Sequence, residues 1–117
     1  MESAYEMLSD KLGRDLYARG LTIACAESCT GGLLTSTLTD IPGSSSYVMG
    51  SVVSYSNDVK SRILHVSEET LLLHGAVSEE TAREMAEGVR QLMQTDIGVG
   101  ITGIAAWLSA RKLRKGR

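Results

Sequence analysis

The chain has 117 residues, of which 43% are hydrophobic and 22% charged, with a net charge of -2. This composition is typical of one soluble globular domain, and the charge gives no overall attraction to nucleic acid. No stretch has the length and apolar character of a secretory signal or a membrane span, so we expect a cytoplasmic protein with no membrane partner. Cys25 and Cys29 have no histidine nearby, so we expect reduced thiols, no metal site and no cofactor.

The first third of the chain alternates between helical and strand patterns. A helix is predicted over residues 3–18, and the short apolar stretch "LTIACA" at 21–26 favours a buried strand. Helical spacing returns in "GGLLTSTLTD" at 31–40, with Thr30 as the expected N-cap. The loop "IPGSSS", which holds the only proline, then precedes the second strand.

The rest of the chain continues the alternation. The pattern predicts a second strand, three helices and a third strand, in this order: 47–56, 58–65, 67–74, 79–93 and 96–103. Strands that alternate with helices are typical of a layered α/β domain. We therefore expect helices packed on a small sheet of three strands.

The stretch "AESCTGG" at 26–32 lies where the first strand gives way to a helix. Free backbone N–H groups at a helix N-terminus bind anions, and the glycines allow a ligand to approach the backbone. Ser28 and Thr30 add hydroxyl groups. One interpretation is therefore a nucleophile beside a phosphate site, and the other is a tight turn with a helix cap.

A second polar stretch, "SYSNDVK" at 54–60, follows the second strand. A serine nucleophile needs a base, and a desolvated lysine such as Lys60 can act as one when its pKa is lowered. The hydroxyl of Tyr55 can relay the proton or orient the group. A lone lysine on a helix is also commonly an exposed surface charge, so this stretch alone does not decide between the two roles.

Four motifs in order resemble one family. The stretches "TIACAESCTGG", "DIPGSSSYVMGSVVSYSNDVK", "HGAVSEETAREMAEG" and "DIGVGITGIA" closely resemble the CinA C-terminal domain family, the nicotinamide-nucleotide amidases, over about residues 5 to 105. The resemblance implies a CinA C-terminal-domain-like three-layer α/β fold. It also implies hydrolysis of the carboxamide of nicotinamide mononucleotide to nicotinic acid mononucleotide and ammonia, within pyridine-nucleotide recycling.

The resemblance also implies roles for individual residues. Ser28 matches the nucleophile of the family, and Tyr55 and Lys60 match the pair that handles the proton. Backbone amides near Thr30, Gly31 and Gly32 are expected to hold either the substrate phosphate or the developing oxyanion. Thr102 and Gly103 are expected to line the same pocket at the end of the third strand. Glu27 is counted among the substrate-binding residues, and it is expected either to orient the lysine or to serve as a plain turn carboxylate.

The chain departs from the family pattern at two places. Ser51 stands where the family usually has a glycine. After residue 105 the family continues with a glycine-rich loop, further strands and a final helix, but here the sequence is "AWLSARKLRKGR". We therefore expect an incomplete amidase domain at 1–105 and a basic tail outside the family at 106–117, as a frameshift or early stop would produce. The tail is expected to be a solvated, disordered end.

Three functional hypotheses follow. The first is an amidase of nicotinamide mononucleotide. The second is an inactive remnant, or a nucleotide-binding protein without turnover, because the loop that helps to close the site is missing. The third is nucleic-acid binding through the five basic residues of the tail, which the net charge does not favour, so no nucleic-acid partner is expected. A sheet with an unpaired edge also makes a second copy of the chain a candidate partner.

Overall fold

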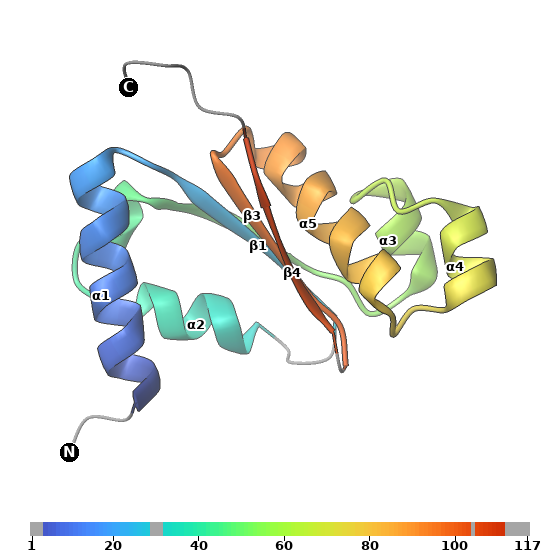
Figure 1. Ribbon diagram of the computed structural model, residues 1–117, viewed down its shortest axis with the longest axis horizontal. Helices are drawn as coiled ribbons and strands as arrows, with labels where there is room; N and C mark the ends of the chain where they lie inside the picture. Colours follow the sequence, from blue (N-terminus) through green and yellow to red (C-terminus); the bar gives the residue numbers. More distant parts are fainter. Residues whose placement is uncertain (1–3, 29–31, 104, 112–117) are drawn as a thin grey trace.

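The computed structural model describes residues 4–28, 32–103 and 105–111, with five helices, a short 3-10 helix and four strands among them (Figure 1). In chain order these elements are α1 (Ala4–Arg19), β1 (Ile23–Glu27), α2 (Leu33–Thr39), η1 (Ser44–Ser46), β2 (Val48–Val53), α3 (Asn57–Arg62), α4 (Glu68–His74), α5 (Glu79–Met93), β3 (Ile97–Ile101) and β4 (Ala106–Ala110). None of these described helices has the length and apolar character needed to cross a membrane.

The strands form one sheet in the order β2-β1-β3-β4. The central strand β1 runs parallel to both β2 and β3, and β4 pairs antiparallel with β3. In this register Glu27 lies opposite Val53 on one side and opposite Ile101 on the other. The carboxyl ends of the three parallel strands are therefore level.

Helices cover both faces of the sheet, which confirms the layered α/β fold. In Figure 1, α1 and α2 lie on one side of the sheet, and α3, α4 and α5 lie on the other. Because side chains alternate along a strand, β1 supplies two separate cores. The core beneath α5 contains Ala24, Ala26, Leu64, Val66, Met85 and Val89. The core beneath α1 and α2 contains Leu16, Ile23, Cys25, Leu38 and Tyr47.

Serine residues occupy the N-cap positions of the three helices on the α5 side of the sheet. The Oγ atoms of Ser56, Ser67 and Ser78 accept hydrogen bonds from backbone N–H groups in the first turns of α3, α4 and α5. Helix α5 then packs directly on β3, where a side chain on Gly98 or Gly100 would overlap the backbone of α5. The alternating glycines of β3 are therefore required by the close approach of this helix.

The expectations of a three-stranded sheet and of a disordered end are wrong for residues 106–110, which form β4. The backbone N–H of Thr102 donates to the carbonyl of Ala105 at 2.8 Å and closes the turn between β3 and β4. The hydroxyl of Ser109 then lies 2.6 Å from Glu87 Oε2 and accepts from Arg90 Nε at 3.1 Å. The side chains of Glu87 and Arg90 on α5 thus hold β4 against this helix.

Beyond β4, Arg111 is also bound to the sheet and is not a free cation. Its backbone N–H donates to the carbonyl of Asp96 at 2.7 Å, and its guanidinium pairs with the carboxylate of the same residue. Burial raises the pKa of Asp96, but hydrogen bonds from Thr22 and Arg111 outweigh it, so the pKa lies below its ordinary value. The other four basic residues of the tail lie within 112–117, outside the described residues.

We predict that Ser109→Ala destabilises the protein by about 1 kcal/mol at pH 7, because it removes the hydroxyl that links β4 to α5. Hydrogen bonds from Ser109 and Arg90 hold the pKa of Glu87 below its ordinary value of 4.5. This contribution is complete above pH 4.5 and is lost as the pH falls through the pKa of the folded state. The destabilisation should therefore be smaller at pH 3 than at pH 7, as measured by urea unfolding.

The matched control is Ser45→Ala, which removes a hydroxyl from an exposed residue of η1. Its free energy of unfolding should equal that of the parent at both pH values. Equal stabilities for Ser109→Ala and Ser45→Ala at pH 7 would contradict the proposed anchoring of β4.

Candidate active site

Three hydroxyl residues lie in a row where the parallel strands end. Ser54, Ser28 and Thr102 directly follow β2, β1 and β3, whose last residues are in register. Two backbone hydrogen bonds extend the pairing into this row: the N–H of Ser28 donates to Ile101 at 3.0 Å, and that of Ser54 donates to Glu27 at 2.8 Å. The predicted residues Ser28 and Thr102 therefore meet at one edge of the sheet, with Ser28 in the middle.

The row lies toward the α5 side of the sheet. The alternation that directs Ala24 and Ala26 toward α5 places Ser28 on that side as well, and the glycines at 98 and 100 give the same result for Thr102. Glu27 belongs to the opposite side, with Cys25 and α2. Ser28 and Glu27 are neighbours in sequence but face opposite layers of the fold.

Lys60 reaches the row from α3 and is buried, with 1% of its surface exposed. Its Nζ donates to the backbone carbonyl of Ser54 at 3.2 Å and lies 3.5 Å from that of Tyr55. Burial lowers the pKa of Lys60 because the charged ammonium loses its hydration. The lysine is thus closer to the neutral form, which can accept a proton, than a surface lysine would be.

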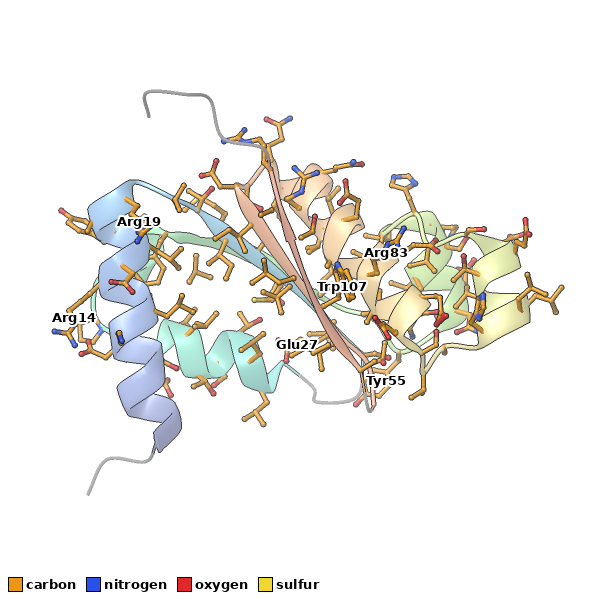
Figure 2. All side chains as sticks on the ribbon, in the orientation of Figure 1. Arg14, Arg19, Glu27, Tyr55, Arg83 and Trp107 are labelled. Atoms are coloured by element: carbon orange, nitrogen blue, oxygen red, sulfur yellow. The ribbon has the colours of Figure 1, made fainter. Side chains whose placement is uncertain are left out.

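Tyr55 contributes its backbone to Lys60, but its side chain points outward. Tyr55 is 77% exposed, and its hydroxyl makes no hydrogen bond with the residues that the structure describes. Figure 2 shows Tyr55 near the end of the β3–β4 hairpin, at the same end of the sheet as Glu27. The structure therefore brings Tyr55 to the site, but it does not place the phenol against Lys60.

The sequence interpretation missed Ser54, whose side chain is fully buried. Its Oγ has no hydrogen-bond partner among the described residues, although its carbonyl accepts from Lys60. A buried hydroxyl without a partner is unusual in a folded protein. The signal that could have identified Ser54 is its position directly after a buried strand, level with Ser28.

Glu27 is fully buried and caps α2 with its carboxylate. Oε1 accepts from the N–H of Leu34 at 2.8 Å, and Oε2 accepts from the N–H and hydroxyl of Thr35 at 3.0 and 2.6 Å. The helix begins at Leu33, with Gly32 in the N-cap position at φ +96°, a left-handed conformation that favours glycine. The prediction of Thr30 as the N-cap is therefore wrong, and the turn carboxylate is the interpretation of Glu27 that the contacts support.

The Glu27 carboxylate occupies part of the place where an anion was expected to bind. The amides of Leu34 and Thr35 already bind a carboxylate, and a second anion beside it would be repelled. Thr30 and Gly31 lie outside the described residues. Their expected role, together with Gly32, in holding a phosphate or an oxyanion stays a prediction, but the first turn of α2 is occupied by Glu27.

Thr102 and Gly103 lie in the turn that leads to β4. Thr102 is buried, and both its N–H and its Oγ1 contact the carbonyl of Ala105, at 2.8 and 3.5 Å. Gly103 is exposed, and a methyl group on it would lie 3.2 Å from Val77. Both residues are at the expected edge of the sheet, and their role in substrate binding stays a prediction.

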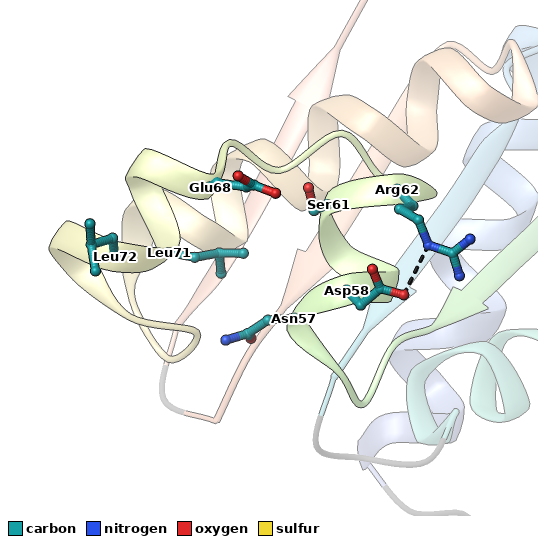
Figure 3. A pocket seen from close by; sticks show the side chains of 7 residues that line it. All are labelled: Asn57, Asp58, Ser61, Arg62, Glu68, Leu71 and Leu72. Carbon is teal, nitrogen blue, oxygen red and sulfur yellow. Dashed lines mark hydrogen bonds and ion pairs between the residues drawn. The ribbon is translucent and has the colours of Figure 1, made fainter.

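Other features of the described residues do not form part of this site. A groove between α3 and α4 (Figure 3) is lined by Asn57, Asp58, Ser61, Arg62, Glu68, Leu71 and Leu72, so it lies on the outer surface of α3, away from the buried Lys60. No group of three or more His, Cys, Asp or Glu side chains in the described part of the chain could hold a metal ion. Burial raises the pKa of the Cys25 thiol to about 11, with a smaller contribution from the charge of Glu27, so Cys25 is no rival nucleophile.

Comparison with known proteins identifies the family. The model of the CinA C-terminal domain matches residues 5–111. A relative from Halothermothrix orenii, named as a competence-damage inducible protein, is 57% identical over 98 residues, which are 84% of this chain and 24% of the relative. A "CinA-like protein" from Desulforapulum autotrophicum is 55% identical over 98 residues, with 84% and 23% covered.

Solved structures give the same result. The competence/damage inducible protein CihA from Agrobacterium tumefaciens superposes with a TM-score of 0.85 at 41% identity, covering 89% of this chain and 63% of that one. A CinA superfamily protein from Escherichia coli superposes with a TM-score of 0.83 at 34% identity, covering 88% and 62%. The chain thus spans about a quarter of the length of these curated relatives and less than two thirds of the solved chains.

We predict that Lys60→Met is at least as stable as the parent at pH 7, by up to about 2 kcal/mol, because methionine fills a similar volume without a desolvated charge. The pKa of Lys60 in the folded state lies below its ordinary 10.5. Between these two values the unfolded chain binds more protons, so the stability of the parent rises with pH through this window. The advantage of Lys60→Met should therefore shrink as the pH approaches 10.5 in denaturant titrations.

Lys11→Met is the control, because Lys11 is an exposed lysine of α1. Its stability difference from the parent should be small and independent of pH in this range. A large loss of stability in Lys60→Met at pH 7 would show that the ammonium stabilises the fold, contrary to this prediction.

Proposed function

Because the chain belongs to the CinA C-terminal domain family, we propose that it is a nicotinamide-nucleotide amidase, which hydrolyses the carboxamide of nicotinamide mononucleotide to nicotinic acid mononucleotide and ammonia. The observation that carries the proposal is the buried Lys60, whose pKa is lowered and whose Nζ binds the carbonyl of the residue in register beside Ser28. A neutral amine at this position is the base that a serine nucleophile requires.

The proposed reaction proceeds in two steps. Neutral Lys60 accepts the proton of the Ser28 hydroxyl while the serine oxygen attacks the carboxamide carbon. The tetrahedral intermediate collapses when the lysine returns the proton to the nitrogen, so the C–N bond breaks and ammonia leaves. A water molecule, activated by Lys60, then attacks the acyl-serine ester and releases the carboxylate product and the Ser28 hydroxyl.

The environment of Lys60 suits this exchange of protons. An ordinary lysine is fully charged at neutral pH and cannot accept a proton, whereas burial brings the pKa closer to the working range. The carbonyls of Ser54 and Tyr55 hold the amine at the edge of the row. For Tyr55 to take part in proton transfer, as the family resemblance implies, its exposed phenol must turn toward the lysine when substrate binds.

Because this chain covers only part of its relatives, a second function is also a candidate. The chain covers 24% of the Halothermothrix relative and 63% of the Agrobacterium chain, so turnover by this chain is itself part of the proposal. The alternative is a protein that binds the nucleotide through the same strand ends without hydrolysing it. Both candidates use the edge where Ser28 and Lys60 lie, and they differ in whether ammonia is formed.

We predict that the purified chain releases ammonia from nicotinamide mononucleotide and that Ser28→Ala lowers kcat by about 1,000-fold or more, because no other group in the proposed mechanism can form the acyl intermediate. A coupled ammonia assay with product identification by mass spectrometry measures this. Circular dichroism should show the same fold in both proteins.

The exposed serine variant Ser45→Ala should keep the activity of the parent. Full activity in Ser28→Ala would reject Ser28 as the nucleophile. A folded parent that binds the nucleotide in calorimetry but forms no ammonia would reject the amidase in favour of binding without turnover.

A further inference from the structure

We infer that Glu27 is a positioning residue for Ser28: its buried carboxylate acts as an internal anion that ties the start of α2 to the end of β1, directly before Ser28, and it takes the place at α2 that a ligand anion would otherwise occupy. This inference rests on the proposed function. It assigns the carboxylate of Glu27 a structural role at α2, which the hydrogen bonds from Leu34 and Thr35 support.

The geometry of the carboxylate ties two elements together. Glu27 is the last residue of β1, and the groups that it accepts from are Leu34 N at 2.8 Å, Thr35 N at 3.0 Å and Thr35 Oγ1 at 2.6 Å. The carboxylate thus ties the start of α2 to the end of β1, and Ser28 is the residue directly after that strand.

A neighbouring strand supports the same carboxylate through Thr35. The Oγ1 atom of Thr35 lies 2.6 Å from Glu27 Oε2 and 2.8 Å from Ser51 Oγ. A hydroxyl has one proton and an ionised carboxylate can only accept, so Thr35 donates to Glu27, and Ser51 donates to Thr35. Ser51, the departure from the family's usual glycine, thus extends the hydrogen-bonded chain from β2 through α2 to β1.

This arrangement needs an acceptor at both carboxylate oxygens. The isosteric Glu27→Gln places an NH2 group against the N–H of Leu34 or against the two donors of Thr35, because an amide has only one acceptor oxygen. The substitution therefore weakens the attachment of α2 to the end of β1 without changing the size of the side chain. Glu27 faces α2 while Ser28 and Lys60 face the α5 side, so the effect must reach the reaction through the position of Ser28.

The experiment compares four variants: Glu27→Gln, Thr35→Val, Thr35→Ser and Thr37→Val. Each is assayed for kcat and KM of ammonia release from nicotinamide mononucleotide, for the rate at which a fluorophosphonate labels Ser28, and for thermal unfolding. Thr37→Val is the matched control, since Thr37 lies on the same helix and its hydroxyl bonds only the carbonyl of Leu33. Thr35→Ser keeps the hydroxyl that Thr35→Val removes.

We expect Glu27→Gln and Thr35→Val to lower kcat and the labelling rate by about 10-fold to 100-fold, with KM changed by less than about 3-fold, because a small displacement of the nucleophile has this effect. Thr35→Ser should restore both rates, and Thr37→Val should match the parent. If Glu27→Gln fails to fold, the comparison of Thr35→Val with Thr35→Ser provides the same test.

The labelling rate separates this inference from the proposed function. A parent that is labelled at Ser28 but releases no ammonia would reject the amidase, and the labelling rates of the variants would still decide the role of Glu27. Unchanged labelling in folded Glu27→Gln and Thr35→Val would overturn the positioning role, as would a rise in KM alone. A folded parent that is not labelled at Ser28 would overturn both proposals, since Ser28 would then be no nucleophile.

Discussion

The candidate site depends on one constraint, which is that β1 is hydrogen-bonded to a parallel strand on each side and ends level with both. Every residue of β1 is buried, so this strand approaches solvent only at its end. The first partly exposed residue there is Ser28. Because β1 is central, its next residue, Ser28, has a neighbour from β2 on one side and from β3 on the other.

Two buried ionisable side chains flank this edge, one in each helical layer, and the protein treats them differently. Glu27 receives three hydrogen-bond donors from α2, so its charge is compensated. Among the described residues, Lys60 has hydrogen bonds to two backbone carbonyls and no ion pair, and burial lowers its pKa. The carboxylate of Glu27 is stabilised in its charged form, whereas the ammonium of Lys60 is destabilised. These two environments suit a proposed site in which Glu27 supports the backbone and Lys60 exchanges protons.

Much of the fold could be predicted from local sequence signals, and the failures share a physical cause. The starts of α3, α4 and α5 follow from serines whose side chains bond the next turn, a contact between residues near in sequence. The start of α2 was misjudged because its cap, Glu27, comes from the preceding strand. Strand β4 was missed because its anchors are distant in sequence: Ser109 bonds Glu87, and Arg111 bonds Asp96. A basic run beside a short apolar stretch gives no sign of such partners.

The candidate residues themselves were identified by resemblance more than by pattern. A serine before two glycines and a lysine on a short helix are each common in surface turns, and only the four motifs together selected Ser28, Tyr55 and Lys60. Burial of Lys60 is a tertiary property that no local pattern encodes. Ser54 was overlooked because a single serine after a strand carries no signal until the register of β2 against β1 is known.

The environment of Cys25 has a consequence for the chemical durability of the protein. With a pKa of about 11, roughly one Cys25 thiol in ten thousand is ionised at pH 7, and thiols react with peroxides and alkylating agents through the ionised form. The sulfur atom is enclosed by the core beneath α1 and α2, which also keeps such reagents away. Cys25 should therefore react slowly with such reagents, and the core beneath α1 and α2 should keep its packing when exposed thiols are oxidised.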